Sequence, residues 1–216
     1  MKNLFLLLTL TFSTASFAAI DVQRRDMKLA SQVLLEKQTI TDADLAGLQA
    51  GAVGIATTAA STTTVTTFVA QPDVCRNVTI DPGGTTASVP AGDVVINGTN
   101  FFGRTITESI TFLADATAAK SGLKAFCSLT SVVFPVQDGA GATYDIGYGD
   151  VLGLKRCMDV AGHVAFAVFD GAYETTRPTC VADADEIEKN TCDINGTLDG
   201  SKDAEIYFIQ NFRCLP

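Results

Sequence analysis

From Val74 onward the sequence is a series of short segments in which apolar and polar residues alternate, and this pattern constrains the fold more than any other feature. In residues 104–112, Arg104 is followed by Thr or Ser at every second position, and these alternate with Ile, Phe and one glutamate, Glu108. Successive side chains of a β-strand point to opposite faces, so this segment is predicted to be a strand with one apolar face. Because Glu108 is on that face, we expect the face to meet a rim or an interface rather than a deep core.

Similar segments recur along the chain, separated by Gly and Asp turns. Residues 81–84 (DPGG) predict a turn and Asn97-Gly98 predicts a hairpin, because Pro, Gly and Asn adopt the backbone angles that turns require. Several short strands at this spacing favour a mainly β fold, either a β-sandwich or a barrel. The other predicted strands are residues 74–80, 93–97, 123–134, 143–148, 163–169 and 204–212.

Residues 20–70 differ from the rest and are predicted to form an N-terminal arm with short helices. Residues 26–37 carry apolar side chains at helical spacing, and residues 41–51 combine an N-cap threonine, Thr41, with a stop at Gly51. The Thr-rich residues 57–68 are either an extended linker or an edge strand that pairs with a neighbouring subunit. The predicted division is therefore an apolar segment over 1–19, the arm over 20–70 and a β-rich domain over 71–216.

The first nineteen residues combine Lys2, an apolar run over 4–12 and small residues that include Ser16 and Ala18. A charged start, a short apolar run and small residues are typical of a cleaved secretory signal peptide. The alternative is an apolar arm that stays attached and packs on a neighbouring subunit. Because the run is short for a membrane span, no membrane association is expected of the mature protein.

The chain has six cysteines, no Cys-x-x-Cys pair and a single histidine, which gives little support for a zinc site. An even number of cysteines in an extracellular protein favours disulfides, with buried free thiols as the alternative. The sequence does not choose among the possible pairings, and bridges between subunits add further options. The disulfide candidates are Cys75, Cys127, Cys157, Cys180, Cys192 and Cys214.

The formal net charge of −9 argues against binding to nucleic acid, because proteins that grip the phosphate backbone need clustered Lys and Arg. The 15 basic residues are scattered apart from Arg24-Arg25. We therefore expect no nucleic-acid partner.

Six segments, taken in order along the chain, carry a resemblance to a known group of proteins. The segments are residues 71–80 (QPDVCRNVTI), 92–108 (GDVVINGTNFFGRTITE), 124–126 (KAF), 130–135 (TSVVFP), 149–154 (GDVLGL) and 169–171 (FDG). They resemble structural proteins of tailed-bacteriophage particles. The likeness spans about half the chain, and the segments occur in the same order as in that loosely defined group. The signal-like start and the six cysteines are departures from that group.

The resemblance implies a β-rich, oligomeric virion protein without catalysis, such as a capsid decoration (cement) protein or a head surface protein. The expected partners are further copies of itself, with a trimer as the working expectation, and other virion proteins such as the major capsid protein. The expected location is the surface of the phage particle. Two alternatives stay open: another virion component of the neck, tail or head fibre, and a secreted, disulfide-stabilised bacterial adhesin or filament subunit.

No residue is nominated as catalytic, cofactor-binding or metal-binding, and no cofactor is expected. His163 could act as a base beside Asp159 or Asp170, but no motif supports the geometry of a triad, so a structural or surface role is favoured. A secreted hydrolase is the enzymatic alternative, and no motif supports a site for it.

Two groups of acidic residues could ligate Ca²⁺, but both lack the terminal bidentate glutamate of an EF-hand. We therefore interpret them as solvated loops and Asx turns. Three Asn-x-Thr sequons begin at Asn77, Asn97 and Asn195, and we interpret them as chance occurrences in a Thr-rich chain. The residues are Asp183, Asp185, Glu186 and Glu188 in one group, and Asp193 and Asp199 with the amide Asn195 in the other.

Overall fold

The computed structural model describes residues 35–40, 50–54, 63–68, 70–196, 198 and 202–209, and these residues form a mainly β protein with three sheets. Sheet A has the order β1 (Leu35–Ile40), β14 (Ala204–Ile209), β10 (Val164–Phe169), β11 (Ala172–Tyr173). Sheet B has the order β12 (Thr179–Val181), β13 (Thr191–Asp193), β9 (Ala142–Gly153), β4 (Arg76–Gly84), β7 (Lys120–Ser121), and β2 (Ala50–Gly54) also pairs with β9. Sheet C has the order β3 (Thr63–Val65), β8 (Ser128–Phe134), β5 (Gly92–Thr99), β6 (Thr105–Phe112).

The helical elements of the described ranges are three short 3-10 turns, η2 (Thr86–Ser88), η3 (Ala161–His163) and η4 (Ile187–Lys189). Within the same ranges, no helix has the length and apolar character needed to cross a membrane.

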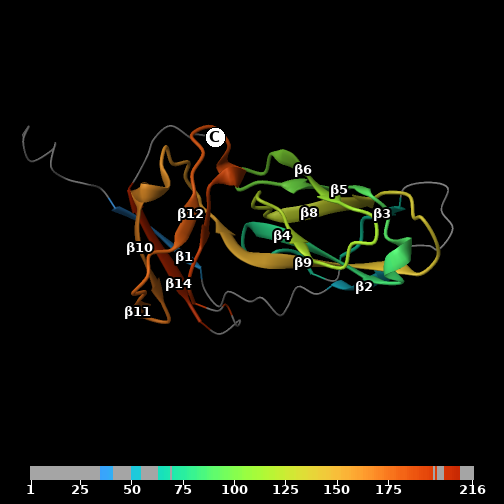
Figure 1. Ribbon diagram of the computed structural model, residues 1–216. Coiled ribbons are helices and arrows are strands. Elements are labelled where there is room, and N and C mark those ends of the chain that lie inside the picture. Colours follow the sequence, from blue (N-terminus) through green and yellow to red (C-terminus); the bar gives the residue numbers. More distant parts are fainter. Residues whose placement is uncertain are drawn as a thin grey trace, which may run out of the picture. The chain divides into compact units, whose positions relative to one another are not determined.

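Sheets B and C contribute side chains to one core, and Figure 1 shows β5, β6 and β8 lying over β4 and β9. Sheet B contributes alternate residues of β4 and β9, and sheet C contributes alternate residues of β5, β6 and β8. The predicted alternation of β6 is confirmed, because Ile106, Ile110 and Phe112 are buried while the Thr and Ser positions are exposed. Burying one apolar face of each sheet in this way supplies the main favourable free energy of folding.

A second core forms around the other end of β9. Leu152 at that end packs with residues of β10, β13 and β14, including Val164, Cys192 and Phe208. The 12-residue strand β9 therefore takes part in both cores. Its pairing with β4 shifts between Arg76 and Val78, and the buried side chain of Asn77 fills the irregularity. Asn77 Nδ2 donates to Gly122 O at 3.2 Å, and its Oδ1 accepts from Val151 N at 3.3 Å.

The chain just before β4 is anchored by polar side chains. Arg76 is fully buried, and its Nη1 donates to Asp73 Oδ1 at 2.9 Å. Burial raises the pKa of Tyr148 to about 12, and the Tyr148 hydroxyl donates to Ala70 O at 3.0 Å. These contacts hold the chain in place at the start of residues 71–80.

The turn predicted at residues 81–84 is wrong, whereas the hairpin predicted at Asn97-Gly98 does form between β5 and β6 but has its turn further along the chain. Residues 81–84 continue β4, where Pro82 lies opposite Tyr144 of β9. Asn97-Gly98 lies inside β5, and the actual turn follows at residues 100–103. Gly98 is needed for a close approach rather than for a turn, because a Cβ there would collide with the Ser128 carbonyl and the Phe126 ring. The side chain of Asn97 bonds to both neighbouring strands. Its Nδ2 donates to Ser131 Oγ of β8 at 3.1 Å, and its Oδ1 accepts from Thr107 Oγ1 of β6 at 2.8 Å.

The N-terminal arm prediction is corrected in part. Residues 35–37, the end of the first predicted helix, belong to β1, and residues 50 and 51, the end of the second, belong to β2. Both segments pair with strands of the later chain, and tertiary strand pairing overrides a short helical pattern. Residues 26–34 and 41–49 lie outside the described residues, as do the signal-like residues 1–19.

Other boundaries also differ from the prediction. The Thr-rich segment contributes an edge strand, β3, which pairs with β8 of the same chain. Residues 123–134, predicted as one strand, contain β8 and a separate bridge between Arg76 and Phe126. The short strands β11, β12 and β13 were not predicted, since two or three residues carry too little alternation to detect.

Candidate functional site

Disulfides join strands of the fold at two places. Cys75 precedes β4 and is bonded to Cys127, which precedes β8. Cys180 of β12 is bonded to Cys192, its direct partner on β13. Cys157 is buried and also disulfide-bonded, whereas Cys214 lies outside the described residues. The prediction of disulfides is confirmed for the two pairs.

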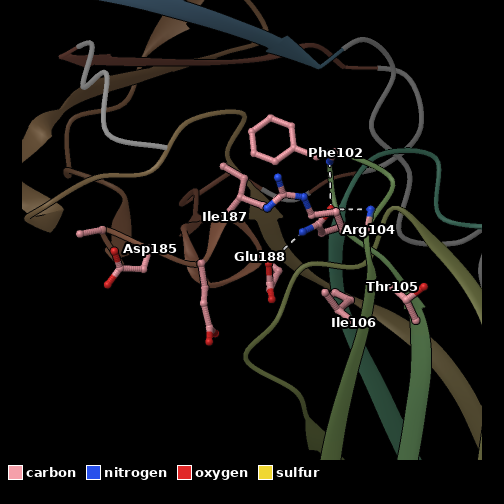
Figure 2. Close-up of a pocket in the computed structure, with 10 residues that line it drawn as sticks. Phe102, Arg104, Thr105, Ile106, Asp185, Ile187 and Glu188 are labelled. Atoms are coloured by element: carbon pink, nitrogen blue, oxygen red, sulfur yellow. Dashed lines mark hydrogen bonds between the residues drawn. The ribbon is translucent and has the colours of Figure 1, made fainter. Parts of the chain in front are cut away.

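A polar pocket of about 260 Å³ lies between the β5–β6 turn and the segment around η4. Figure 2 shows Phe102, Arg104 and Ile106 on one side of it and Ile187 and Glu188 on the other. Asn100 and Glu188 line the pocket although both are almost fully buried, at 5% and 8% exposure. Asn100 Nδ2 donates to Glu188 Oε2 at 3.1 Å, which joins the two sides.

The turn that carries Glu188 is organised by two neighbouring side chains. Asn190 is fully buried, and its Nδ2 donates to the carbonyls of Asp183 and Glu186 at 2.7 and 2.9 Å. The Asp183 carboxylate accepts the backbone N–H groups of Glu186 and Asp185, and these bonds hold the pKa of Asp183 below its ordinary value. The interpretation of this acidic group as an Asx turn is confirmed at Asp183. Among the residues that the structure describes, no cluster of His, Cys, Asp and Glu is arranged to hold a metal ion.

Two lysines lie against the acidic turn. Lys124 Nζ is 3.7 Å from Glu188 Oε1 and 3.9 Å from Glu186 Oε2. Lys189 Nζ is 2.7 Å from Glu186 Oε2 and 3.8 Å from Asp183 Oδ2. Lys124 is half-buried and Lys189 is exposed, so of the two it is Lys124 that reaches the buried carboxylate of Glu188.

An apolar groove of about 370 Å³ adjoins this cluster and is lined by residues of β6, β9, β12 and β13 and of the chain after β7. Leu123 is 77% exposed and Val181 is 55% exposed, and both line the groove. Val151, Thr179 and Thr191 also line it. Exposed aliphatic side chains gathered at one concave surface are typical of a site that contacts another protein.

Glu108 fixes one wall of the apolar groove. Its carboxylate accepts the backbone N–H of Leu123 at 2.6 Å and that of Lys124 at 3.3 Å, so it holds the chain after β7 against β6. Burial raises the pKa of Glu108, and the two backbone donors offset part of that increase. The expectation that this face of residues 104–112 meets a rim or an interface rather than a deep core is wrong for Ile106, Ile110 and Phe112, which are buried in the core shared by sheets B and C. Only Glu108 is half-buried, in the wall of the apolar groove.

A second carboxylate in the groove is also perturbed. Burial raises the pKa of Asp193, and the nearby charges of Asp150 and Glu174 raise it further. The groove therefore combines aliphatic side chains with two carboxylates that ionise less readily than they would in water.

The remaining residues singled out in the sequence are dispersed. His163 ends η3, immediately before β10, and is half-buried. The sequon asparagine Asn77 is buried and hydrogen-bonded inside sheet B, Asn97 is bonded to its strand neighbours, and Asn195 donates to Thr176 O at 2.8 Å. From the sequence, Glu188 was considered only as part of an acidic loop, and Asn100 and Lys124 were not singled out. The three residues are far apart in sequence, and only the fold brings them together.

Comparisons with family models, with curated proteins and with solved structures found no match for this chain.

Proposed function

We propose that this chain is a non-enzymatic structural protein of a tailed-phage particle, and that it stabilises the particle as a capsid decoration protein. The observation that carries the proposal is the apolar groove, in which Leu123 and Val181 are largely exposed beside a wall fixed by Glu108. A second copy of the chain or another virion protein, such as the major capsid protein, would cover these aliphatic side chains. Burying them would contribute roughly 25 cal/mol per Å² of apolar area removed from water.

The fold fits a mechanical role. We infer that sheets B and C form a β-sandwich rather than a barrel, because each sheet ends in edge strands and their facing residues share one core. A disulfide at Cys75–Cys127 connects the two sheets, so an outward force on one is transmitted to the other through a covalent bond. The short helical N-terminal arm and the trimer remain part of the proposal.

The test is the location of the protein. Antibodies raised against the purified domain should label intact particles of the phage that encodes it, and the protein should co-sediment with those particles. A Leu123→Asp, Val181→Asp variant should fold but lose co-sedimentation, because it places two charges on the apolar groove. A surface control, Thr130→Asp on β8, should sediment like the original protein. Absence of the protein from particles would overturn the proposal.

The second candidate is a secreted adhesin or filament subunit, and the observation that favours it is the set of disulfides. Disulfides form and persist in oxidising compartments, which an exported protein enters. The intact mass separates the two candidates. A mature protein that lacks the signal-like residues and is found on uninfected cells supports export, whereas a particle-bound protein that keeps them supports the virion role.

A further inference from the structure

Three side chains with complementary chemistry meet beside the polar pocket. Lys124 carries an amine, Asn100 carries an amide, and the Glu188 carboxylate contacts both. Lys124 Nζ is 3.7 Å from Glu188 Oε1, and Asn100 Nδ2 donates to Glu188 Oε2 at 3.1 Å. The amine and the amide therefore occupy the two oxygens of one carboxylate.

The amide of Asn100 is polarised at its carbonyl as well. Its Oδ1 accepts the backbone N–H of Phe102 at 3.0 Å and that of Arg104 at 3.1 Å. These bonds organise the β5–β6 turn, and they also form a pair of fixed donors aimed at one oxygen. Paired backbone N–H groups in a water-poor site stabilise the negative charge that develops on a carbonyl oxygen when a nucleophile attacks its carbon.

We propose that Lys124 and Asn100 form an intramolecular amide crosslink, with Glu188 as the proton-transfer group. Glu188 accepts a proton from the Lys124 ammonium, and the neutral amine attacks Cγ of Asn100 to form the Nζ–Cγ bond. The proton on Glu188 then passes to Nδ2, the Cγ–Nδ2 bond breaks, and ammonia leaves. Nζ then gives a second proton to Glu188. Glu188 passes this proton to the released ammonia, which leaves as ammonium.

The surroundings favour this reaction over hydrolysis. Asn100 and Glu188 are 5% and 8% exposed, so water has little access to the amide carbon. Holding the reacting groups on one carboxylate makes the step intramolecular, which removes much of the entropic cost of bringing them together. The polar pocket that Asn100 and Glu188 line opens a path for ammonia to leave.

The bond would tie the end of β5 to the chain between β7 and β8. Asn100 follows β5, and Lys124 lies three residues before Cys127, where the Cys75–Cys127 disulfide is attached. The two covalent links would therefore meet on one segment, and unlike the disulfide the amide would survive reduction.

The intact mass of the reduced, denatured full-length protein tests the proposal. Most molecules should be lighter than the mature sequence by about 17 Da, the mass of the one ammonia lost in the reaction. Proteolysis should release a branched peptide in which the segments containing Asn100 and Lys124 are joined. A reduced protein with its full mass, and no branched peptide after prolonged incubation, would overturn the proposal without bearing on the virion role.

Variants separate this reaction from other losses of ammonia. Lys124→Arg should abolish the loss, whereas the matched control Lys120→Arg, which alters a neighbouring lysine that donates to Thr111 O, should retain it. Glu188→Gln should leave freshly purified protein uncrosslinked. Cyclisation at Asn97-Gly98 or Asn195-Gly196 loses the same mass, but it gives no branched peptide and persists in Lys124→Arg. A branched peptide containing Asn100 that persists in Lys124→Arg would show that Lys124 is not the nucleophile. Should a variant fail to fold, the presence or absence of the branched peptide in the original chain decides the matter.

Discussion

Removing the Cys75–Cys127 disulfide should destabilise the protein more than removing Cys180–Cys192, although the second bridge includes a fully buried sulfur. The bridges span 52 and 12 residues of sequence. When a crosslink acts by restricting the unfolded chain, its effect grows with the logarithm of the loop that it closes. That relation gives about 4 kcal/mol for the longer loop and about 3 kcal/mol for the shorter loop at 25 °C.

The assay is urea unfolding of two double variants, Cys75→Ala with Cys127→Ala and Cys180→Ala with Cys192→Ala. Losing a crosslink also expands the unfolded chain, so the slope of the unfolding free energy against urea should increase, and more for the longer loop. In the presence of reductant, the free energy of unfolding of the original chain should no longer exceed that of either variant. A larger loss for the Cys180–Cys192 variant, with unchanged slopes, would refute the loop-entropy reasoning and point to the packing of Cys192 in the second core.

Three further outcomes follow from single positions. Gly98→Ala should lower the free energy of unfolding by about 2 kcal/mol or more in urea titration, because its Cβ would meet the Ser128 carbonyl. Burial raises the pKa of Glu108 above the ordinary 4.5, so the folded state holds that proton more tightly than the unfolded state. The stability contributed by the protonated form is therefore complete below about pH 4.5 and is lost as the pH rises through the raised value. Glu108→Gln should abolish this dependence in unfolding measured across pH. Leu123→Asp should change stability by no more than about 0.5 kcal/mol while lowering self-association measured by light scattering.

Each of these outcomes has a matched comparison. Gly147→Ala, also within a strand, should cost little, since nothing lies within 4 Å of its added Cβ. A similar loss at Gly98 and Gly147 would contradict the close-approach argument. For Glu108, stability of the original chain that rises relative to Glu108→Gln with increasing pH would show that the sign is wrong. For Leu123, unchanged association would remove the apolar groove from the oligomer interface.

The apolar alternation of residues 104–112 was enough to predict a strand with one apolar face, because this depends only on the two-residue period of a strand. It did not predict that this face enters the core, because Glu108 is accommodated there by the backbone N–H of Leu123, which only the fold brings near. The position of the turn in the β5–β6 hairpin could not be predicted, for a related reason. A glycine such as Gly98 can serve either in a turn or where another part of the chain passes close to its backbone. Only the positions of Ser128 and Phe126 in the fold show that the second role applies. Tertiary pairing likewise placed residues 35–37 in a strand despite their helical spacing.

The sequence by itself determined that the protein is mainly β and that it forms disulfides, since residue type and short-range period carry that information. Only the tertiary structure decided that Cys75 pairs with Cys127 and Cys180 with Cys192, because pairing depends on which strands become neighbours. The tertiary structure also decided that the apolar groove forms and that Glu188 contacts both Asn100 and Lys124. Residues from 24 to 88 positions apart acquire their common chemistry only when long-range strand pairing brings them together.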